Sequence, residues 1–177
     1  MRDTIASIEG EYRRYKALGE RALEQLDDRQ LVTVPPGAGN SIATIVWHVS
    51  GNLKSRFSDF LTSDGEKPWR NREEEFRKRD VTKSEVTEKW AEGWRVLFDA
   101  LAPLDDAQLD STVAIRGVAL SVRDALIRSL SHTSYHVGQI AFWGKSLRGG
   151  DWNYLTIPPG KSEEYRRNPQ HEKPPRP

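Results

Sequence analysis

Apolar residues recur at three- and four-residue steps in four separate stretches of the chain, with charged residues between them. This spacing places the apolar side chains on one face of an α-helix. Proline, glycine or polar segments separate the stretches, and none shows the pattern of a parallel sheet. The sequence therefore predicts an all-α protein, a four-helix bundle. Its helices are expected to run from about Thr4 to Leu26, Ser41 to Leu61, Thr82 to Ala102 and Ser121 to Leu147.

Residues that cap helices mark where three of these helices begin. Asn40 or Ser41 is placed to accept a hydrogen bond from the first turn of the second helix. Thr82–Glu85 has the spacing of a capping box at the start of the third helix. Ser121–Asp124 resembles a second capping box, with aspartate in place of the usual glutamate.

Two segments outside the helices also carry a signal. Residues 112–118 favour a short extended piece that turns at Gly117. The irregular C-terminal tail after the fourth helix has no periodicity, and it is expected to pack as a strap near Trp152. We therefore expect a single domain over residues 1–168 and a flexible tail over residues 169–177.

A long polar loop over residues 64–79 connects the second and third helices. Connections of this length in a compact domain are often functional. Two roles stay open: the loop covers a pocket mouth and helps to select a substrate, or it caps the far end of the bundle as a structural lid. The predicted helix end at Leu61 lies about 20 Å along the axis from His48, so the lid is the favoured role.

The chain of 177 residues has 27 basic and 26 acidic residues, which gives a formal net charge of +1. This balance argues against a nucleic-acid or anionic-membrane partner, because such binders carry a basic face or tail. No apolar run is long enough to cross a membrane, and the N-terminal segment lacks the apolar core of a signal peptide. We therefore expect a cytoplasmic location.

The sequence contains no cysteine. Disulfides, thiolate-bound metals and thiol nucleophiles are excluded, and histidine, aspartate and glutamate remain as metal ligands. Three of the four histidines lie in predicted helices. His132 and His136 are one helical turn apart, so both imidazoles can reach one ion, and His48 on another helix would complete a three-nitrogen site with an open position.

A single histidine in a helix is more often structural than a ligand, and only the pair together with His48 favours metal binding. The zinc-protease signature requires glutamate directly after the first histidine of the pair, and this chain has Thr133 there. Tyr135 and Gln139 lie beside the pair and are candidate hydrogen-bond partners for it. Asp59 is a candidate fourth ligand, which would close the site and give it a structural role.

The long loop contains further charged and aromatic residues. The acidic run 73–75 is interpreted as a solvated face rather than a source of a catalytic carboxylate. Trp69 is expected to anchor the loop on apolar surface. The alternative is that Trp69, Arg70 and Arg72 line a pocket for an anionic group.

Several stretches together resemble the DinB-like, or YfiT-like, superfamily of metalloenzymes, and more narrowly an uncharacterised bacterial branch of it. The resemblance spans nearly the whole chain. The matching stretches are Ile45–Asn52, Asp64–Arg72, Ser131–Ile140 and Ile157–Glu164. The resemblance implies a four-helix bundle of up-down-down-up topology, often dimeric, with a three-histidine site that falls on His48, His132 and His136.

Functions in that superfamily include thiol-dependent transferases and isomerases. The resemblance and the histidines favour an enzyme in which a divalent metal, zinc or nickel before iron or manganese, activates a water or a low-molecular-weight thiol. Hydrolysis of, or transfer to, a small electrophile would follow, with a small-molecule substrate and a homodimeric assembly. The alternative is a non-catalytic metal-binding bundle that serves as a binding or structural module. The sequence assigns no catalytic or cofactor-binding residue beyond the three metal ligands.

Overall fold

The computed structural model describes residues 1–37 and 39–170, and this part of the chain is mostly helical. Four long helices dominate: α1 (Asp3–Leu23), α3 (Ile42–Phe57), α5 (Lys83–Leu101) and α6 (Val122–Arg148). Three short helices accompany them: α2 (Asp28–Val32), α4 (Arg72–Glu75) and α7 (Ser162–Arg166). Single 3-10 turns form at Asp106–Gln108 and Gly149–Asp151. None of these helices is long and apolar enough to span a membrane.

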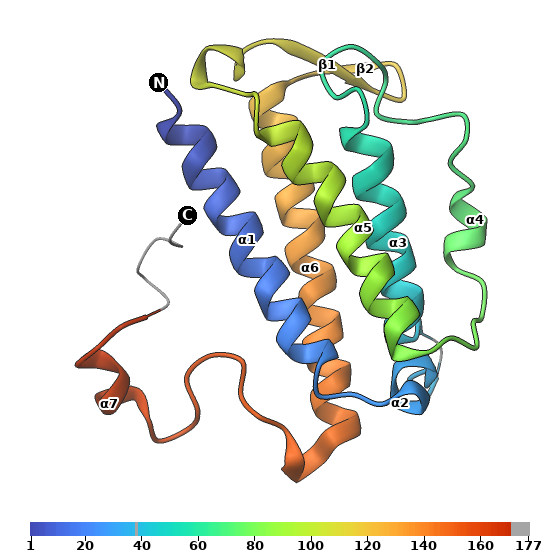
Figure 1. Cartoon of the computed structure of the whole chain (residues 1–177), viewed down its shortest axis with the longest axis vertical. Coiled ribbons are helices and arrows are strands. Elements are labelled where there is room, and N and C mark those ends of the chain that lie inside the picture. Colours follow the sequence, from blue (N-terminus) through green and yellow to red (C-terminus); the bar gives the residue numbers. More distant parts are fainter. Residues whose placement is uncertain (38, 171–177) are drawn as a thin grey trace.

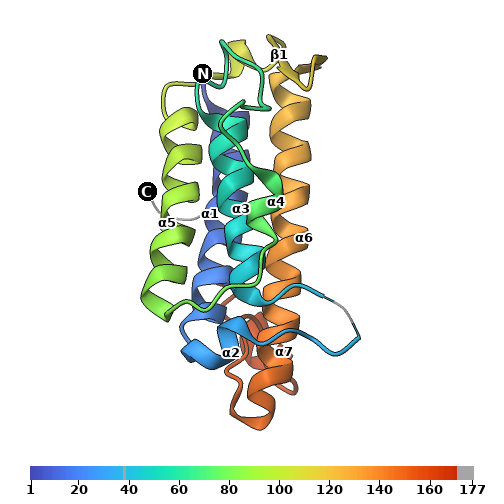
Figure 2. The same ribbon diagram turned by 90° about the vertical axis from the view of Figure 1, so that its right-hand side faces the viewer.

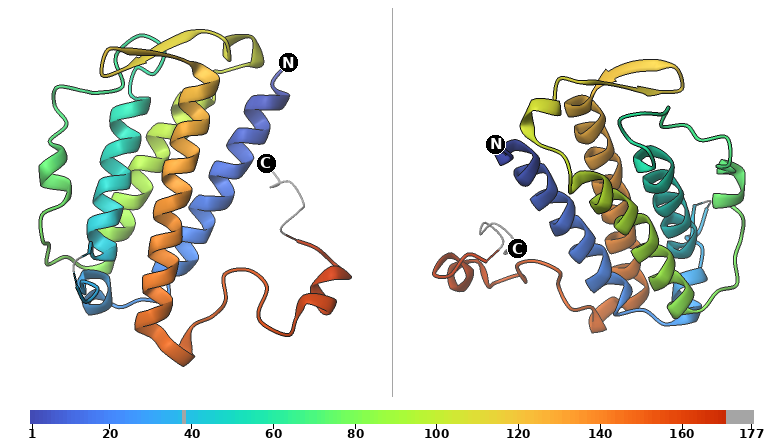
Figure 3. Two further views of the ribbon diagram at one scale, coloured as in Figure 1. Left: turned by 180° about the vertical axis from the view of Figure 1, so that it is seen from behind. Right: turned by 45° about the horizontal axis from the view of Figure 1, so that its top comes forward.

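The four long helices lie side by side, and each contacts two others (Figures 1 and 3). Both α3 and α1 pack against α5 and α6. Colour order along the chain in Figure 1 shows that α1 and α6 run in one direction and α3 and α5 in the other. Apolar faces of all four meet in one core. Its largest fully buried side chains include Ile5, Tyr12, Leu53, Trp90, Trp94, Leu97, Leu126 and Ile140.

Close packing of α3 and α5 depends on a glycine. A Cβ atom at Gly93 of α5 would lie 2.6 Å from the Cα atom of Ser50 in α3. Real Cβ atoms do not approach a backbone this closely, so glycine at this position lets the two backbones touch. The contact fixes the position of the helix that carries His48.

The predicted caps are present at the three helix starts. Oγ of Ser41 accepts a hydrogen bond from the backbone N–H of Thr44. Thr82 and Glu85 form a reciprocal capping box at the start of α5. Oγ of Ser121 accepts from the N–H of Asp124 at the start of α6. The sequence could predict these caps because each hydrogen bond joins residues three positions apart.

Other boundaries differ from the expectation. α1 ends at Leu23 rather than Leu26, because Asp27 caps the separate short helix α2. α3 ends at Phe57 rather than Leu61, since Ser58 is extended and Asp59 has a φ of 49°. Helices as short as α2 and α7 span too few turns for an apolar period, which is why the sequence pattern does not show them.

The extended piece predicted over residues 112–118 forms a hairpin, so the fold includes a small two-stranded sheet. β1 (Thr112–Ile115) pairs antiparallel with β2 (Val118–Ser121). Both residues of the connecting turn, Arg116 and Gly117, have positive φ, as tight hairpin turns of this length require. The hairpin lies across one end of the long helices (Figure 1).

The connection from α3 to α5 returns along the length of the protein, because these two helices are parallel. It first reaches the hairpin, where the carboxylate of Asp64 accepts hydrogen bonds from the N–H groups of Arg116 and Gly117. It then descends through α4, which lies against α3 (Figure 2). The long loop therefore passes directly beside the middle of α3.

The first part of the tail after α6 packs as the expected strap, whereas residues 156–164 are exposed and α7 lies away from the long helices (Figures 1 and 3). Trp152 is buried, and its ring contacts the position of Gly144 in α6. The guanidinium of Arg21 donates to the carbonyl of Leu155, which ties the strap to α1. Most of the flexible tail predicted over residues 169–177 lies outside the described residues, and the division at residue 168 stays a prediction.

Candidate metal centre

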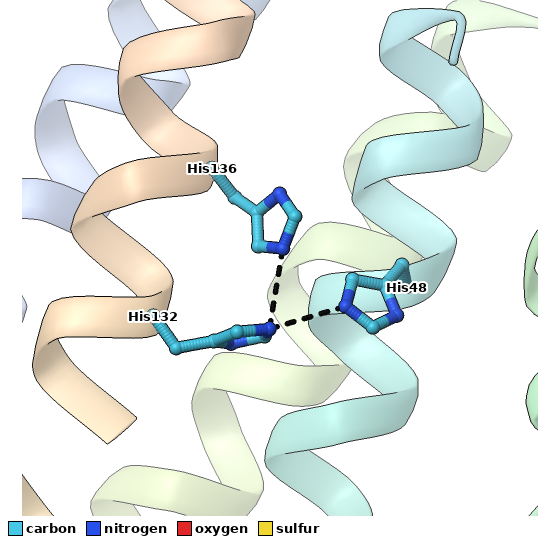
Figure 4. Close-up of side chains that lie close together, drawn as sticks. All are labelled: His48, His132 and His136. Carbon is cyan, nitrogen blue, oxygen red and sulfur yellow. Dashed lines mark hydrogen bonds between the residues drawn. The ribbon is translucent and has the colours of Figure 1, made fainter. Parts of the chain in front are cut away.

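Three imidazoles from two helices meet between α3 and α6 (Figure 4). His48 projects from α3, and His132 and His136 project from adjacent turns of α6. The Nε2 atom of His132 lies 3.2 Å from Nε2 of His48 and 3.2 Å from Nε2 of His136. Tetrahedral nitrogen ligands about 2.05 Å from a zinc ion would lie about 3.3 Å apart. Two of the three nitrogen–nitrogen distances are therefore close to those expected around one metal ion, and all three ligand atoms lie within 4.8 Å of one another.

Hydrogen bonds orient two of the three rings. Nδ1 of His48 lies 2.9 Å from Oε2 of Glu75, and Nδ1 of His136 lies 2.8 Å from Oε1 of Gln139. Both oxygens are acceptors, so each Nδ1 carries the proton and each Nε2 presents its lone pair to the centre. Such outer hydrogen bonds are the usual way in which proteins orient histidine ligands.

Glu75 is itself held in place by Arg70. Nε of Arg70 donates to Oε1 of Glu75 at 2.7 Å, and Nη2 donates to Oε2 at 2.9 Å. Burial alone would raise the pKa of Glu75, but hydrogen bonds from His48 and Arg70 outweigh it and lower that pKa. The carboxylate is therefore ionised. The lack of a side chain at Gly51 leaves room for it, because a Cβ there would lie 2.2 Å from Oε1 of Glu75.

Two residues of α6 complete the surroundings of His136. Gln139 accepts from His136 through its amide oxygen, and its amide nitrogen donates to the hydroxyl of Tyr135 at 3.0 Å. The ring of Tyr135 packs edge-on against His136. The expectation of a hydrogen bond to the pair is therefore confirmed for Gln139, whereas Tyr135 bonds only to Gln139 and contacts His136 through its ring.

The local environment keeps the two α6 imidazoles neutral. Burial, followed by the neighbouring imidazoles, lowers the pKa of His132 to about 3. Burial also lowers the pKa of His136 to about 4, although its hydrogen bond to Gln139 opposes the shift. Metal binding requires the neutral form of histidine. Near neutral pH both side chains are therefore ready to act as ligands.

Among the described residues, no carboxylate joins the three histidines as a fourth ligand. Asp59, the candidate from the sequence, is exposed and lies after the end of α3. A cavity of about 370 Å³ opens beside the centre, with His48 and His132 in its wall. A metal held by the three imidazoles would therefore keep an open side toward this cavity.

The acidic run was interpreted wrongly at one position. Glu73 is exposed, as expected, but Glu75 is buried against His48. The long loop combines both alternatives in position: its first half packs against the hairpin at the far end of the bundle, as the favoured role expects, and its second half reaches the histidines. α3 ends earlier than expected, and its parallel neighbour α5 forces the loop to return.

Trp69 is 56% exposed and does not anchor the loop, whereas Arg70 and Arg72 line the cavity.

The protein is therefore a mostly helical protein with a three-histidine cluster that could hold a metal ion. Residues 2–161 match the family described as "Protein of unknown function (DUF1572)", and the chain belongs to that family. The structure is similar to the crystal structure of a conserved protein from Enterococcus faecalis, with a TM-score of 0.66 and 19% sequence identity. The similarity covers 84% of this chain and 99% of the other, and it concerns the fold alone. No curated protein matches the chain.

Proposed function

We propose that His48, His132 and His136 bind a divalent metal ion and that the protein is a metal-dependent enzyme acting on a small electrophile. The observation that carries the proposal is the convergence of three imidazole nitrogens beside a cavity. Zinc or nickel suits three nitrogen ligands best, and iron or manganese are the alternatives. When bound, such a metal lowers the pKa of a water or thiol at its open position.

The protein's own residues would hold and orient these ligands. Glu75 fixes the ring of His48, and Gln139 fixes the ring of His136. Arg70 neutralises Glu75, which keeps the buried carboxylate from carrying an uncompensated charge. The cavity admits a small molecule to the open side of the site.

The proposed architecture is the DinB-like four-helix bundle. It is supported by the helix directions, since α1 and α6 run one way and α3 and α5 run the other way (Figure 1).

We also propose a homodimer formed through α6. Ile127, Tyr135 and Phe142 are 51%, 61% and 75% exposed, and their spacing places them on one face of that helix. Light scattering of the purified protein and of Phe142→Ser tests this contact. The near balance of charge supports a protein without nucleic-acid or anionic-membrane partners, and we propose a cytoplasmic location.

A screen for turnover separates the enzyme from its rival, a non-catalytic metal-binding module. Metal-loaded protein would be assayed with pairs of a low-molecular-weight thiol and an electrophile, and with simple esters and amides. The proposal expects turnover that chelation abolishes and metal restores. If chelation changes only the melting temperature and no substrate pair reacts, the module is the correct function.

A further inference from the structure

The cavity beside the histidines is much more basic than the protein as a whole. Within the described part of the chain, its lining includes five arginines and no aspartate or glutamate. The whole chain, by contrast, has nearly equal numbers of basic and acidic residues. The arginines are Arg56, Arg70, Arg72, Arg116 and Arg128.

Three of these arginines are paired with acidic side chains behind the wall. Glu75 neutralises Arg70 through two hydrogen bonds. Arg56 and Arg116 share the single carboxylate of Glu66, at 3.2 and 2.9 Å. The carboxylate of Asp64 also lies beside this pair, since it accepts a hydrogen bond from the backbone N–H of Arg116 and interacts with the charge of Arg56, so this part of the wall is close to neutral.

Arg72 and Arg128 are the arginines with the weakest pairing. The contact of Arg72 with Glu73 is 3.7 Å long, and both side chains are half or more exposed, so it contributes little. Arg128 is exposed and makes no ion pair with any other residue in the described ranges. The guanidinium of Arg72 also lies 4.8 Å from the centre of the Phe76 ring, a contact that does not use its N–H groups, so both guanidinium groups can still donate to a ligand.

Two polar residues of the cavity lie one helical turn from the histidines. Arg128 precedes His132 by one turn of α6, and Asn52 follows His48 by one turn of α3. Since α3 and α6 run in opposite directions, both residues are displaced from the centre toward the hairpin (Figure 1). One turn corresponds to about 6 Å along a helix axis. The amide of Asn52 has no hydrogen-bond partner among the described residues, which leaves it free for a ligand.

Most of the remaining wall is apolar. Phe57 and Phe60 come from the end of α3, and Val113, Ile115 and Leu120 come from the hairpin. A free inorganic anion would leave this surface in contact with water. A ligand with an apolar body would cover this surface. Its binding free energy would become more favourable by about 25 cal/mol for each Å² of apolar surface removed from water.

We propose that this cavity binds a small organic anion with an apolar body, whose carboxylate or phosphate contacts Arg72, Arg128 and Asn52. The guanidinium fork matches both oxyanions. Because His48 and His132 line the same cavity, a ligand bound in this way extends toward the open side of the histidine centre. This inference rests on the proposed function only in treating the bound anion as a substrate of the metal centre. The anion site itself is built from residues other than the three histidines.

Binding of simple probes tests this directly. Benzoate and phenyl phosphate supply the two oxyanions on an apolar body, benzamide is a neutral analogue, and inorganic phosphate lacks the apolar body. Affinity would be measured by calorimetry on the metal-loaded protein and on the chelator-treated protein. We expect benzoate, phenyl phosphate or both to bind in each state, and benzamide and inorganic phosphate to bind at least tenfold more weakly. The tighter of the two aromatic anions identifies the oxyanion.

Arginine variants locate the site. Arg72→Gln and Arg128→Gln should each lower the affinity for the aromatic anions about tenfold or more, because each removes a charged hydrogen bond. Arg95→Gln, an exposed arginine of α5 outside the cavity, is the matched control and should bind as the parent does. Circular dichroism would show that all variants are folded.

Separate outcomes distinguish failure of this inference from failure of metal binding. Unchanged affinity in both cavity variants, equal binding of benzamide, or no binding of either aromatic anion at millimolar concentration would overturn the anion site. Anion binding that needs the metal and ignores both arginines would also overturn it, while leaving the metal centre intact. Arginine-dependent binding in a protein that takes up no metal would keep the anion site and refute the proposed function.

Discussion

Oε2 of Glu75 lies 2.9 Å from Nδ1 of His48, a contact between residues 27 positions apart in the sequence. The other nitrogen of the same ring faces His132. One carboxylate therefore fixes which nitrogen of His48 faces the candidate metal centre. Arg70 completes a chain of contacts from the long loop to the histidines.

Glu75→Gln tests this relationship. The substitution keeps the size of the side chain but removes the charge that orients His48 and pairs with Arg70. We expect metal affinity to fall about tenfold, the lower end of the range for such orienting residues. Competition with a chromogenic chelator measures it. Glu73→Gln, in the same short helix but exposed, should leave affinity unchanged; equal losses in both variants would refute a specific role for Glu75.

Gly51→Ala tests the space that Glu75 occupies. The new Cβ would lie 2.2 Å from Oε1 of Glu75, so the carboxylate must move away from His48 or the helix must shift. We expect weaker metal binding and a loss of about 1–3 kcal/mol in the free energy of unfolding. Denaturant titration measures the second effect.

A matched control for this variant is Gly138→Ala in α6. A Cβ there meets no atom within 4 Å, and alanine stabilises a helix interior by roughly 0.5–1 kcal/mol relative to glycine. The two glycine variants should therefore change stability in opposite directions. A stable, fully metal-binding Gly51→Ala protein would contradict the arrangement of Glu75.

The lowered pKa values of His132 and His136 predict a pH dependence of stability in metal-free protein. Unfolded histidine titrates near pH 6.5, whereas the folded values are about 3 and about 4. Between these values the unfolded chain binds more protons, so the free energy of unfolding falls as pH falls below about 6.5. From pH 6.5 to 5 the loss would reach at most about 2 kcal/mol for each histidine.

Urea titrations at pH 7, 6 and 5 in the presence of a chelator measure this slope. A His132→Asn/His136→Asn double variant lacks both titrating groups and should show a flatter pH dependence in the same range. Identical slopes for the parent and the double variant would show that the two imidazoles are not buried in their neutral form.

Local signals in the sequence predicted the long helices and much of the candidate site. The caps at Ser41, Thr82 and Ser121 join residues three positions apart, and His132 and His136 are one turn apart on one helix. Such relationships depend on helical geometry alone. The mostly helical fold and the pairing of His132 with His136 follow from them. The meeting with His48, which the resemblance implied, depends on the packing of α3 against α6, and the role of the three side chains as ligands stays a prediction.

The long loop could not be placed from its own residues. Its path follows from the parallel direction of α3 and α5, which obliges the chain to return along the protein. The up-down-down-up topology implied by the resemblance already requires this return. The distance of about 20 Å from His48 to Leu61 describes only where the loop begins, and it does not describe where the loop passes. Glu75 was missed for the same reason: its burial depends on tertiary packing and not on its acidic neighbours.

Metal content is the most direct test of the central claim, that the three histidines form a metal centre. Purified protein would be loaded with zinc or nickel, desalted and measured by elemental analysis. His48→Ala and His136→Ala would be measured beside it, and Ser131→Ala on the exposed face of α6 serves as the control. The account predicts one tightly held ion per chain in the parent and the control, and loss of that ion in both histidine variants. Equal metal content in all four folded proteins would contradict it.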